Sequence, residues 1–594
     1  MICLRRRFRS PYISVRLCSS SSSSSNPLPF ELLDIHTSSD LITNQQWHTL
    51  KSLTKSTNPN LFLQHLYDSN APYDTLLQYF KWSEQHFQLT HSLQHYCKLF
   101  YVLANNKRYD KIRSLLDTSF ANTKYSCCSV LCMLNEVCDN VCAHSIIVDL
   151  LVLGYVKNCK VDLGFEAFDR AGDYGLKLSV VSCNQLISLL VKEEKFGRVE
   201  FVYREMVKRR VAVNLVTFNM VINGLCKAGW MRKAEDVFED MQVRGILPSV
   251  VTYNTLIHGY CGAGKMYKAD ALMKDMVKRK IVPNNVTYNA LIDGFCKVEN
   301  VSAAMNLFKK MQQDSGLKPD VVTYNSLING LCCVGKPDKA LELRDQMVES
   351  GVKPSLVTYN VVMNGFSKQK MVRECKEVFD DISKQGLSPN AYSYNTLLNA
   401  YIQAGNLEEA VKLFKLMLEE SSVSPNVSTY NSLIAGYSRE GDIEAVNRLV
   451  DDMKERDLKA DIVTYNIRIG ALCKKGESRE AVKLLNEMSR GGLIPIQLTY
   501  NTLMSGYCEE GNLRAALNVM TRMEKEGKRP NVATYNVLIK AFCDKDKLDE
   551  ANEFLNKMLE KGLVPNHMTY DIVREKMMER GFVPDIDGHL YNYT

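Results

Sequence analysis

The sequence predicts an all-α protein, a right-handed superhelical α-solenoid built from 35-residue helix-turn-helix repeats. Three observations predict this fold. The segment Val-Val-Thr-Tyr-Asn-Thr-Leu-Ile at 250–257 returns at 321–328 with one changed residue. Related segments recur every 35 residues, apart from two steps of 36. Within each unit, apolar residues recur at helical spacing and are followed by Gly or Pro, as in a repeat of two short helices.

The repeats occupy most of the 594 residues. Counted from the residue two before the recurring Thr, twelve units begin at 145, 180, 215, 250, 285, 321, 356, 391, 427, 462, 497 and 532. A degenerate unit begins near 93, and a truncated one begins at 567. We therefore expect an organelle transit peptide at 1–30 and a helical region with degenerate repeats at 31–144. Twelve tandem repeats follow at 145–566, and a truncated repeat and tail at 567–594.

The unit that begins at 250 illustrates the expected helices. Its first helix carries Val251, Leu256, Ile257 and Tyr260 as one apolar stripe, and a second amphipathic helix follows from 266. In other units, a Gly ends the second helix before the next turn; these are Gly245, Gly351, Gly386, Gly492, Gly527 and Gly562. One hairpin cannot bury both stripes alone, so neighbouring hairpins must stack on one another.

The amino-terminal segment is basic and rich in Ser. Its five arginines account for five of the seven net positive charges, and the first acidic residue is Glu31. An Arg-rich, Ser-rich and acid-free segment is typical of an organelle transit peptide, here mitochondrial or, alternatively, chloroplast. A disordered basic tail is the other interpretation. The remaining chain carries only +2, so overall charge does not by itself predict nucleic-acid binding.

The 19 cysteines do not indicate disulfides or a metal site. Their number is odd, and no Cys-x-x-Cys occurs. Seven occupy one equivalent point of the repeat, as expected for a small buried side chain: Cys226, Cys261, Cys296, Cys332, Cys473, Cys508 and Cys543. A denser cluster lies at 127–142, but only His144 could complete a metal site there, so we expect no metal.

The motifs of the repeat resemble one known family. Gly-Leu-Cys-Lys-Ala-Gly at 224–229 is followed by Ala234, Phe238 and Met241. Together with Val-Thr-Tyr-Asn and the 35-residue period, this pattern resembles the pentatricopeptide repeat family, in particular its P class of plant organelle proteins. The resemblance implies binding of single-stranded organelle RNA at about one nucleotide per repeat. The tetratricopeptide repeat, which binds peptides, has 34 residues and a Trp-containing pattern that is missing here.

The resemblance also implies a role for several positions of each unit. Position 2 would clamp a base, although simple core packing is the alternative for a Val. The implied base-clamping residues are Val181, Val216, Val251, Val286, Val322, Val357 and Val463. Tyr392, Ser428, Leu498 and Ala533 depart from Val at this position.

Position 5 and the last residue of each unit would form the base-selecting pair. The alternatives are a structural hydrogen bond between repeats for the Asn, and helix capping for the last residue. The implied pairs are Asn184/Asn214, Asn219/Ser249, Asn254/Asn284, Asn289/Asp320, Asn325/Ser355, Asn360/Asn390, Asn395/Asn426, Asn431/Asp461, Asn501/Asn531 and Asn536/Asn566. Asn466/Ile496 should tolerate any base, and Asp149/Ser179 is unreadable. By the resemblance, the array reads 5′-Y-C-Y-U-C-Y-Y-U-?-Y-Y-3′.

Position 13 would contact phosphate, with a solvated helix end as the alternative. The implied residues are Lys157, Lys192, Lys227, Lys297, Lys368, Arg439 and Lys474. Glu509 and Asp544 depart from this pattern, which puts phosphate contact by the last two units in doubt.

No catalytic motif accompanies the repeats. The sequence lacks His-x-Glu with Cys-x-x-Cys, as a zinc deaminase would need, and lacks a phosphate-binding Gly-x-x-x-x-Gly-Lys loop. We expect a monomer without enzymatic activity, cofactor or membrane span. Its partners would be single-stranded organelle RNA and proteins of RNA processing, and its binding would stabilise, splice or help translate a transcript. A protein-interaction scaffold of the same architecture is the alternative.

Overall fold

The computed structural model describes residues 35–53, 59–87, 91–119, 125–313, 316–419 and 423–581. The expected transit peptide at 1–30 and the end of the expected tail at 582–594 lie outside these residues. Every regular element in the described ranges is a helix. This confirms the predicted all-α solenoid of helix-turn-helix repeats. No described helix is both long and apolar enough to cross a membrane.

The first compact unit spans Met1–Gly259. Its early helices are irregular in length, and regular pairs of 13-residue helices follow. In order, the helices are α1 (Ile35–Thr43), α2 (Trp47–Leu53), α3 (Pro59–Asp68), α4 (Tyr73–Phe87), α5 (Leu93–Asn105), α6 (Tyr109–Ser119), α7 (Cys127–Val137), α8 (Val141–Lys157), α9 (Val161–Asp173), α10 (Val180–Lys192), α11 (Phe196–Lys208), α12 (Leu215–Lys227) and α13 (Met231–Val243). The boundary between the two units falls within α14 (Val250–Gly262).

The second compact unit spans Tyr260–Thr594 and continues the regular pairs. Its helices are α15 (Met266–Lys278), α16 (Asn285–Lys297), α17 (Val301–Gln313), α18 (Val321–Cys333), α19 (Pro337–Glu349), α20 (Leu356–Lys368), α21 (Val372–Lys384), α22 (Ala391–Gln403), α23 (Leu407–Glu419), α24 (Val427–Glu440), α25 (Ile443–Glu455), α26 (Ile462–Lys474), α27 (Ser478–Arg490), α28 (Gln497–Glu509), α29 (Leu513–Lys525), α30 (Val532–Asp544), α31 (Leu548–Glu560) and α32 (His567–Ile572). A π-helical turn, Val573–Met577, and a 3₁₀ turn, Met578–Arg580, end the described chain.

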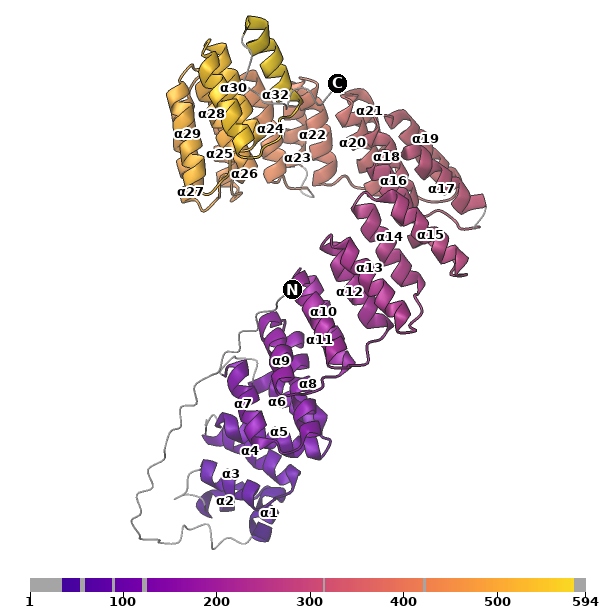
Figure 1. The fold of residues 1–594 in the computed structure, drawn as a ribbon, viewed down its shortest axis with the longest axis vertical. Coiled ribbons are helices and arrows are strands. Elements are labelled where there is room, and N and C mark those ends of the chain that lie inside the picture. Colours follow the sequence, from indigo (N-terminus) through magenta and orange to yellow (C-terminus); the bar gives the residue numbers. More distant parts are fainter. Residues whose placement is uncertain are drawn as a thin grey trace. The chain divides into compact units, whose positions relative to one another are not determined.

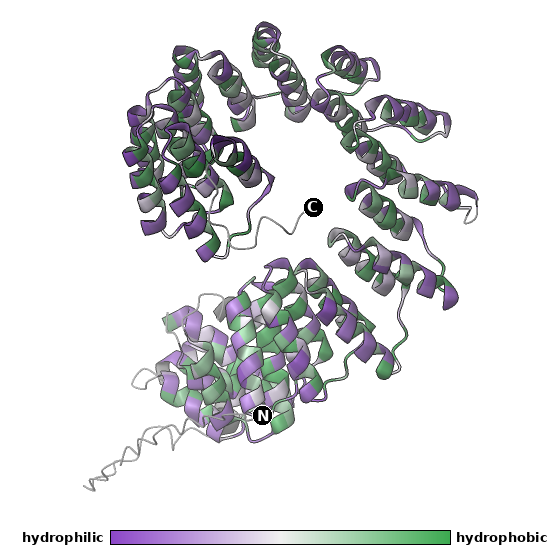
Figure 2. Ribbon diagram, turned by 45° about the horizontal axis from the view of Figure 1, so that its top comes forward, coloured by the Kyte–Doolittle hydropathy of each residue, from purple (hydrophilic) through white to green (hydrophobic). Residues whose placement is uncertain are grey.

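Within each unit the helices stack as hairpins (Figure 1). Each second helix packs on the first helix of its own repeat, and each first helix packs on the first helix of the next repeat, as α16, α18 and α20 do. Hydrophobic and hydrophilic residues alternate along these helices (Figure 2). Because the first helices form the continuous row, a side chain at one position of this helix recurs at equivalent places along the row.

The recurring Tyr packs between repeats, as the sequence predicts. The ring of Tyr324 lies 5.4 Å from that of Phe308, which belongs to the second helix of the preceding repeat. Phe379 and Tyr394 repeat this contact at 5.1 Å, at a near-perpendicular angle that favours aromatic pairs. The Phe in the second helix of one repeat therefore packs against the Tyr in the first helix of the next repeat, and the two rings join the cores of both repeats.

One first helix begins before the predicted start of its repeat. The unit placed at 145 has a first helix, α8, that begins four residues earlier, at Val141. Asn140 caps this helix, because its side-chain oxygen accepts a hydrogen bond from the backbone N–H of Cys142 at 2.9 Å. Because Asn140 is a good N-cap, α8 begins four residues before the equivalent position of the other repeats.

Successive first helices approach closely near their carboxyl ends, where a Gly of one faces a Cys of the previous one. A Cβ placed on Gly330 would lie 2.5 Å from Cys296 Sγ and 2.7 Å from its Cβ. A Cβ on Gly294 would lie 2.7 Å from Cys261 Sγ. Burial raises the pKa of Cys296 to about 12, so its thiol remains protonated and acts as a small apolar side chain.

A buried histidine lies in the amino-terminal part of the first compact unit. His91 has no exposed surface, and its ring nitrogens lie 2.9 Å from Asn60 Oδ1 and 2.9 Å from Ser83 Oγ. Burial is the main cause that lowers the pKa of His91. The native state therefore holds this ring neutral under conditions in which an unfolded chain would protonate it.

Stability of this region should consequently fall in mild acid. The unfolded chain takes up a proton below about pH 6.5 and the native chain only at lower pH, so the contribution of neutral His91 is complete above that value and is lost as pH falls. The expected slope is up to about 1.4 kcal/mol per pH unit for this group. Urea unfolding between about pH 5 and pH 8, followed by the fluorescence of Trp47 and Trp82, measures it.

Two variants control this experiment. His91→Gln removes the titrating group and should flatten the slope, whereas His258→Gln, at an exposed position, should not change it. Equal slopes for the wild-type chain and His91→Gln would show that other groups cause the acid sensitivity.

Candidate nucleic-acid interface

The side chains at position 2 lie on the surface of the first helices. All seven valines are between 51% and 58% exposed, although the residue that follows each, Ser182 or a Thr, is fully buried. Tyr392 and Leu498 are exposed to a similar degree, at 55% and 59%. Core packing therefore does not explain these residues. Within each compact unit, these side chains lie at equivalent points of successive first helices and are open to solvent.

The two members of a predicted base-selecting pair lie side by side in several repeats. The Nδ2 of Asn289 donates to Asp320 Oδ1 at 3.1 Å, and that of Asn431 donates to Asp461 Oδ1 at 3.1 Å. Asn536 makes the same bond to Asn566 at 3.1 Å. Two longer contacts complete this set, Asn395 to Asn426 at 3.3 Å and Asn184 to Asn214 at 3.5 Å.

A hydroxyl of the following repeat holds the other end of the position-5 amide. In nine repeats, the Thr or Ser at position 3 of the next first helix donates to the Asn Oδ1 at 2.6–2.9 Å. The structural hydrogen bond between repeats that the sequence allowed is therefore present. It occupies the amide oxygen and leaves the NH₂ group directed toward the last residue.

The last residue of each pair also caps the next helix, which was the other structural alternative. Asn426 Oδ1 accepts from the backbone N–H of Thr429 at 3.1 Å, and Asp320 Oδ1 accepts from that of Thr323 at 2.9 Å. Since the oxygen of a capping Asn faces the helix, its NH₂ group points away from the cap. The NH₂ groups of exposed Asn214, Asn390, Asn426 and Asn566 have no partner among the described residues.

The two aspartates at the last position stay ionised. Burial opposes ionisation of Asp320, but the N–H and hydroxyl of Thr323 and the amide of Asn289 together hold its pKa below the usual range. Asp461 is held in the same way by Thr464 and Asn431, and its pKa is also lowered. Where Asn ends a unit the pair generally offers a donor, and where Asp ends it the pair offers a permanent acceptor.

Three pairs differ from the others in the polar groups that they can offer. Both carboxylate oxygens of Asp149 are occupied, by the N–H and hydroxyl of Ser179 at 2.8 and 2.9 Å and by the hydroxyl of Ser182. Ile496 offers no polar group, so Asn466 bonds only to Thr499, at 2.7 Å. The third is Asn325, whose buried Oδ1 has no partner.

Asn284, which is predicted to select a base, also caps a helix, as the other Asn residues at this position do. Its Oδ1 accepts from the backbone N–H and from the hydroxyl of Thr287, both at 3.1 Å. The Thr287 hydroxyl in turn accepts from the backbone N–H of Asn284 at 3.2 Å, which completes a capping box at the start of α16. The oxygen of Asn284 is therefore committed to the helix, and base selection together with Asn254 remains a prediction that concerns only its NH₂ group.

Asn531 uses both ends of its side-chain amide within the protein. Its Oδ1 caps α30 by accepting from the backbone N–H of Thr534 at 3.0 Å. Its NH₂ group donates to Gln497 Oε1 at 3.1 Å, at the start of the preceding first helix, and so is not directed to a ligand alone. Base selection by the pair Asn501/Asn531 remains a prediction, and it requires Asn531 to share or release this bond before it can donate to a base.

The predicted phosphate contacts are all exposed, at the last turn of the first helices. Lys157 pairs with Asp117 at 2.5 Å, Lys297 pairs with Asp293 at 2.7 Å, and Arg439 donates to the carbonyl of Ile402 at 3.5 Å. The remaining four make no ion pair with a described residue: Lys192, Lys227, Lys368 and Lys474. These four are the cations most available to a ligand.

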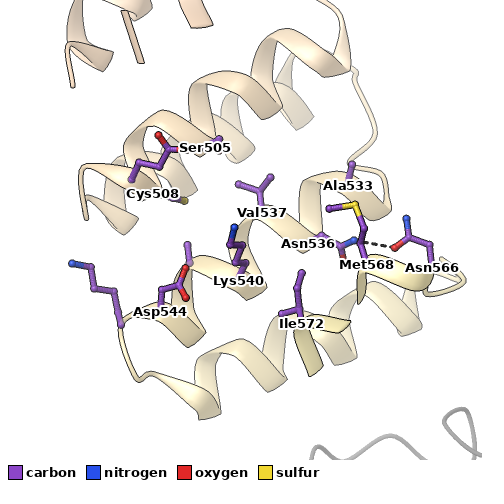
Figure 3. Close-up of a pocket in the computed structure, with 13 residues that line it drawn as sticks. Ser505, Cys508, Ala533, Asn536, Val537, Lys540, Asp544, Asn566, Met568 and Ile572 are labelled. Carbon is purple, nitrogen blue, oxygen red and sulfur yellow. Dashed lines mark hydrogen bonds between the residues drawn. The ribbon is translucent and has the colours of Figure 1, made fainter. Parts of the chain in front are cut away.

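A cavity of about 370 Å³ opens among α28, α30 and α32, where the position-2 residue is the small Ala533 (Figure 3). Asn536 and Asn566 line it together with the exposed Met568, which is position 2 of the truncated repeat. Lys540 also lines it and was missed by the sequence analysis. It lies one helical turn before Asp544, on the same face, and this spacing could have revealed it.

In the described ranges, no group of three or more His, Cys, Asp and Glu side chains could hold a metal ion. Cys128 and Cys132, in the dense cysteine cluster, approach one another to 4.0 Å between their sulfurs, and Cys132 lies 3.3 Å from the Tyr174 hydroxyl.

Two proteins of Arabidopsis thaliana are similar in sequence. A mitochondrial pentatricopeptide repeat-containing protein is 27% identical over 202 residues, which is 32% of this chain and 37% of that protein. Another pentatricopeptide repeat-containing protein is 30% identical over 111 residues, which is 18% of each chain. The matches therefore span well under half the length of these relatives.

Solved structures of one maize protein are similar over most of the chain. The crystal structure of the pentatricopeptide repeat protein PPR10 aligns with a TM-score of 0.43 at 21% identity, covering 93% of this chain and 92% of that one. PPR10 in complex with an 18-nucleotide psaJ RNA element aligns with a TM-score of 0.34 at 20% identity, covering 94% and 98%.

The sequence pattern of the PPR repeat family matches the chain repeatedly between residues 178 and 577. The eleven matched segments are 178–227, 213–254, 248–297, 283–333, 319–368, 354–401, 391–430, 425–474, 460–495, 495–544 and 530–577. Together they cover well over half of the chain, and their spacing is that of the helical hairpins. The chain belongs to the PPR repeat family.

Proposed function

We propose that this protein binds single-stranded RNA in a sequence-specific manner, at about one base per repeat, and favours a pyrimidine-rich site. The arrangement of each base-selecting pair carries the proposal. In nine repeats, hydrogen bonds within the protein orient the position-5 amide, and in most of these an exposed apolar side chain stands at position 2 of the same helix. Such a unit can contact the face of an unstacked base and the hydrogen-bonding edge of the same base.

The fixed polarity of the pairs is compatible with the pyrimidine reading. Uracil presents an N3–H donor on its Watson–Crick edge, which suits the ionised Asp320 and Asp461. Cytosine presents N3 as an acceptor, which suits the outward NH₂ group of Asn426 and its equivalents. A donor also suits adenine N1 and an acceptor suits guanine N1–H, so the preference for pyrimidines comes from the family resemblance.

The protein would act by occupying its RNA rather than by catalysis, and thereby stabilise, splice or help translate a transcript. The 35-residue spacing supports the P class of the family. The Arg-rich and Ser-rich amino terminus, together with the mitochondrial relative, supports a mitochondrial location, with the chloroplast as the alternative.

A gel-shift titration of the full chain tests the proposal. The probe 5′-CCCUCCCUCCC-3′ should bind at least about tenfold more tightly than a purine-rich RNA of equal length, a difference of ~1.4 kcal/mol. Equal binding of both RNAs would contradict base reading, and binding of neither would favour a protein-interaction scaffold.

A charge variant provides the matched control. Replacing Lys192, Lys227, Lys368 and Lys474 with Gln should weaken binding to all RNAs about equally. It should also reduce the salt dependence, by about 0.7 in the slope of log K against log salt per lost phosphate contact. The ratio of pyrimidine to purine binding should not change, because phosphate contacts carry no sequence information.

A further inference from the structure

The hydroxyls at position 3 are the most regular polar feature of the array and are not among the predicted site residues. They belong to Thr or Ser side chains that are 0–1% exposed. In nine repeats they reach across the boundary between repeats to the position-5 Asn of the preceding unit. A fully buried hydroxyl that bonds to a base-selecting side chain can control what that side chain presents.

The number of hydrogen atoms fixes the direction of these bonds. In the repeat that begins at 215, the backbone N–H of Ser249 can only donate, and it donates to Thr252 Oγ1 at 3.1 Å. The single hydrogen of the Thr252 hydroxyl must therefore point elsewhere. Asn219 Oδ1 lies 2.7 Å away and is closer than Ser249 Oγ at 3.2 Å, so Asn219 receives it.

This bond sets the orientation of the Asn219 amide. Its oxygen must face Thr252, which leaves the NH₂ group for the groove. In pairs that end in Asp or Asn, the last residue can give a second restraint, because its oxygen accepts from the NH₂ group, as Asp320 does from Asn289. No such bond joins Asn219 to Ser249, so the hydroxyl of Thr252 acts alone there.

From this geometry we propose that the position-3 hydroxyl is a positioning residue for RNA recognition, which orients the base-selecting amide of the preceding repeat. The proposal rests on the proposed RNA-binding function. It identifies a third determinant of specificity for each base, in addition to the two residues of the pair.

The chain contains a natural comparison. Asn219/Ser249 and Asn325/Ser355 are the same pair of residue types, but only the first has the restraining bond. In the second, Thr358 lies 3.3 Å from Ser355 Oγ and accepts from the Ser355 N–H at 3.1 Å, and the buried Oδ1 of Asn325 has no partner. The first repeat should therefore discriminate between bases better than the second.

The experiment uses the full chain and the eleven-nucleotide RNA, varied to each of the four bases at its second or fifth nucleotide. These two nucleotides face the repeats that begin at 215 and 321. Wild-type protein should discriminate at the second nucleotide by about three- to tenfold more than at the fifth, in keeping with one well-placed hydrogen bond. Thr252→Val should reduce discrimination at the second nucleotide to the level of the fifth and leave other nucleotides unchanged.

Two variants separate positioning from folding. Thr252→Ser keeps the hydroxyl, as Ser393 does naturally with Asn360 at 2.7 Å, and should retain discrimination. Thr521→Val removes an exposed hydroxyl on a second helix, bonded only to the carbonyl of Leu517, and should have no effect.

The outcomes distinguish this inference from the function on which it rests. Wild-type protein without any base preference would refute the proposed function itself. Base preference that is equal at the second and fifth nucleotides would overturn the positioning role, even if Thr252→Val did not fold. Retained discrimination in a folded Thr252→Val, or a uniform loss at every nucleotide, would overturn it as well.

Discussion

Replacing Asp320 with Asn should change the preferred base at the fourth nucleotide of the RNA from uracil to cytosine, by about tenfold or ~1–2 kcal/mol. The carboxylate is an acceptor that remains ionised, and it suits the N3–H of uracil. The amide would keep its oxygen on the Thr323 N–H and direct its NH₂ group outward, as Asn426 does, and this donor suits cytosine N3. Affinity for the four bases at this nucleotide, measured by competition, gives the result.

The substitution separates recognition from stability. Asn and Asp are about equally good N-caps, so the melting temperature should change little. Asp461→Asn should produce the same change at the eighth nucleotide, whereas Asp236→Asn, on a second helix, should alter nothing. A loss of affinity that is equal for all bases at all nucleotides would contradict reading by separate repeats.

Gly330→Ala should lower the free energy of unfolding by about 1–3 kcal/mol, the usual cost of overfilling a packed interface. The added methyl would lie 2.5 Å from Cys296 Sγ and 3.4 Å from the backbone Cα of the same residue, so α16 and α18 would have to separate. Ala is otherwise preferred to Gly within a helix by ~1 kcal/mol. A destabilisation therefore reports the contact between the helices. Urea unfolding and hydrogen exchange of α16 and α18 measure it.

Gly470→Ala is the matched control, because its nearest neighbour would be Thr502 Cγ2, at 3.6 Å. This variant should be as stable as the wild-type chain or more stable. Adding Cys296→Ala to Gly330→Ala removes the sulfur and should recover part of the loss. Equal behaviour of the two Gly variants would show that the close approach of the first helices does not contribute to stability.

The sequence predicted the register of the array, because the period of 35 and the recurring Thr define equivalent positions. The first helices begin at the predicted residue in every repeat from Val180 to His567. Position 2 could be placed on a helix, but its exposure depends on how neighbouring helices stack, and core packing remained an alternative until that stacking was known.

The remaining features depend on distances between side chains of different repeats. The bond from Thr323 to Asn289 joins residues 34 apart in sequence, and a pattern within one repeat does not reveal it. Lys157 pairs with Asp117, and the side-chain oxygen of Asn325 has no partner. Both residues differ in their contacts from the residues at the same position of other repeats, and the position in the repeat does not reveal this difference.

The bond from Asn531 to Gln497 is a departure of the same kind. Asn531 and Asn284 occupy the same position of the repeat, and both cap a helix with their side-chain oxygen. The NH₂ group of Asn531 bonds to Gln497, the first residue of the neighbouring first helix, and the residue at this position varies along the array. The identity of the last residue alone therefore does not determine what a repeat presents.

In the pairs that end in Asn, the last residue caps a helix with its side-chain oxygen, and the proposed contact with RNA would use its NH₂ group. Only a few short polar side chains can start a helix well, and the same few are the residues proposed to select bases. Mutation among Asn, Asp and Ser at this site can therefore change one letter of the target while the scaffold stays intact. Such an array could change its proposed target one base at a time through folded intermediates, and a repeat that ends in a residue such as Ile496 would read no base.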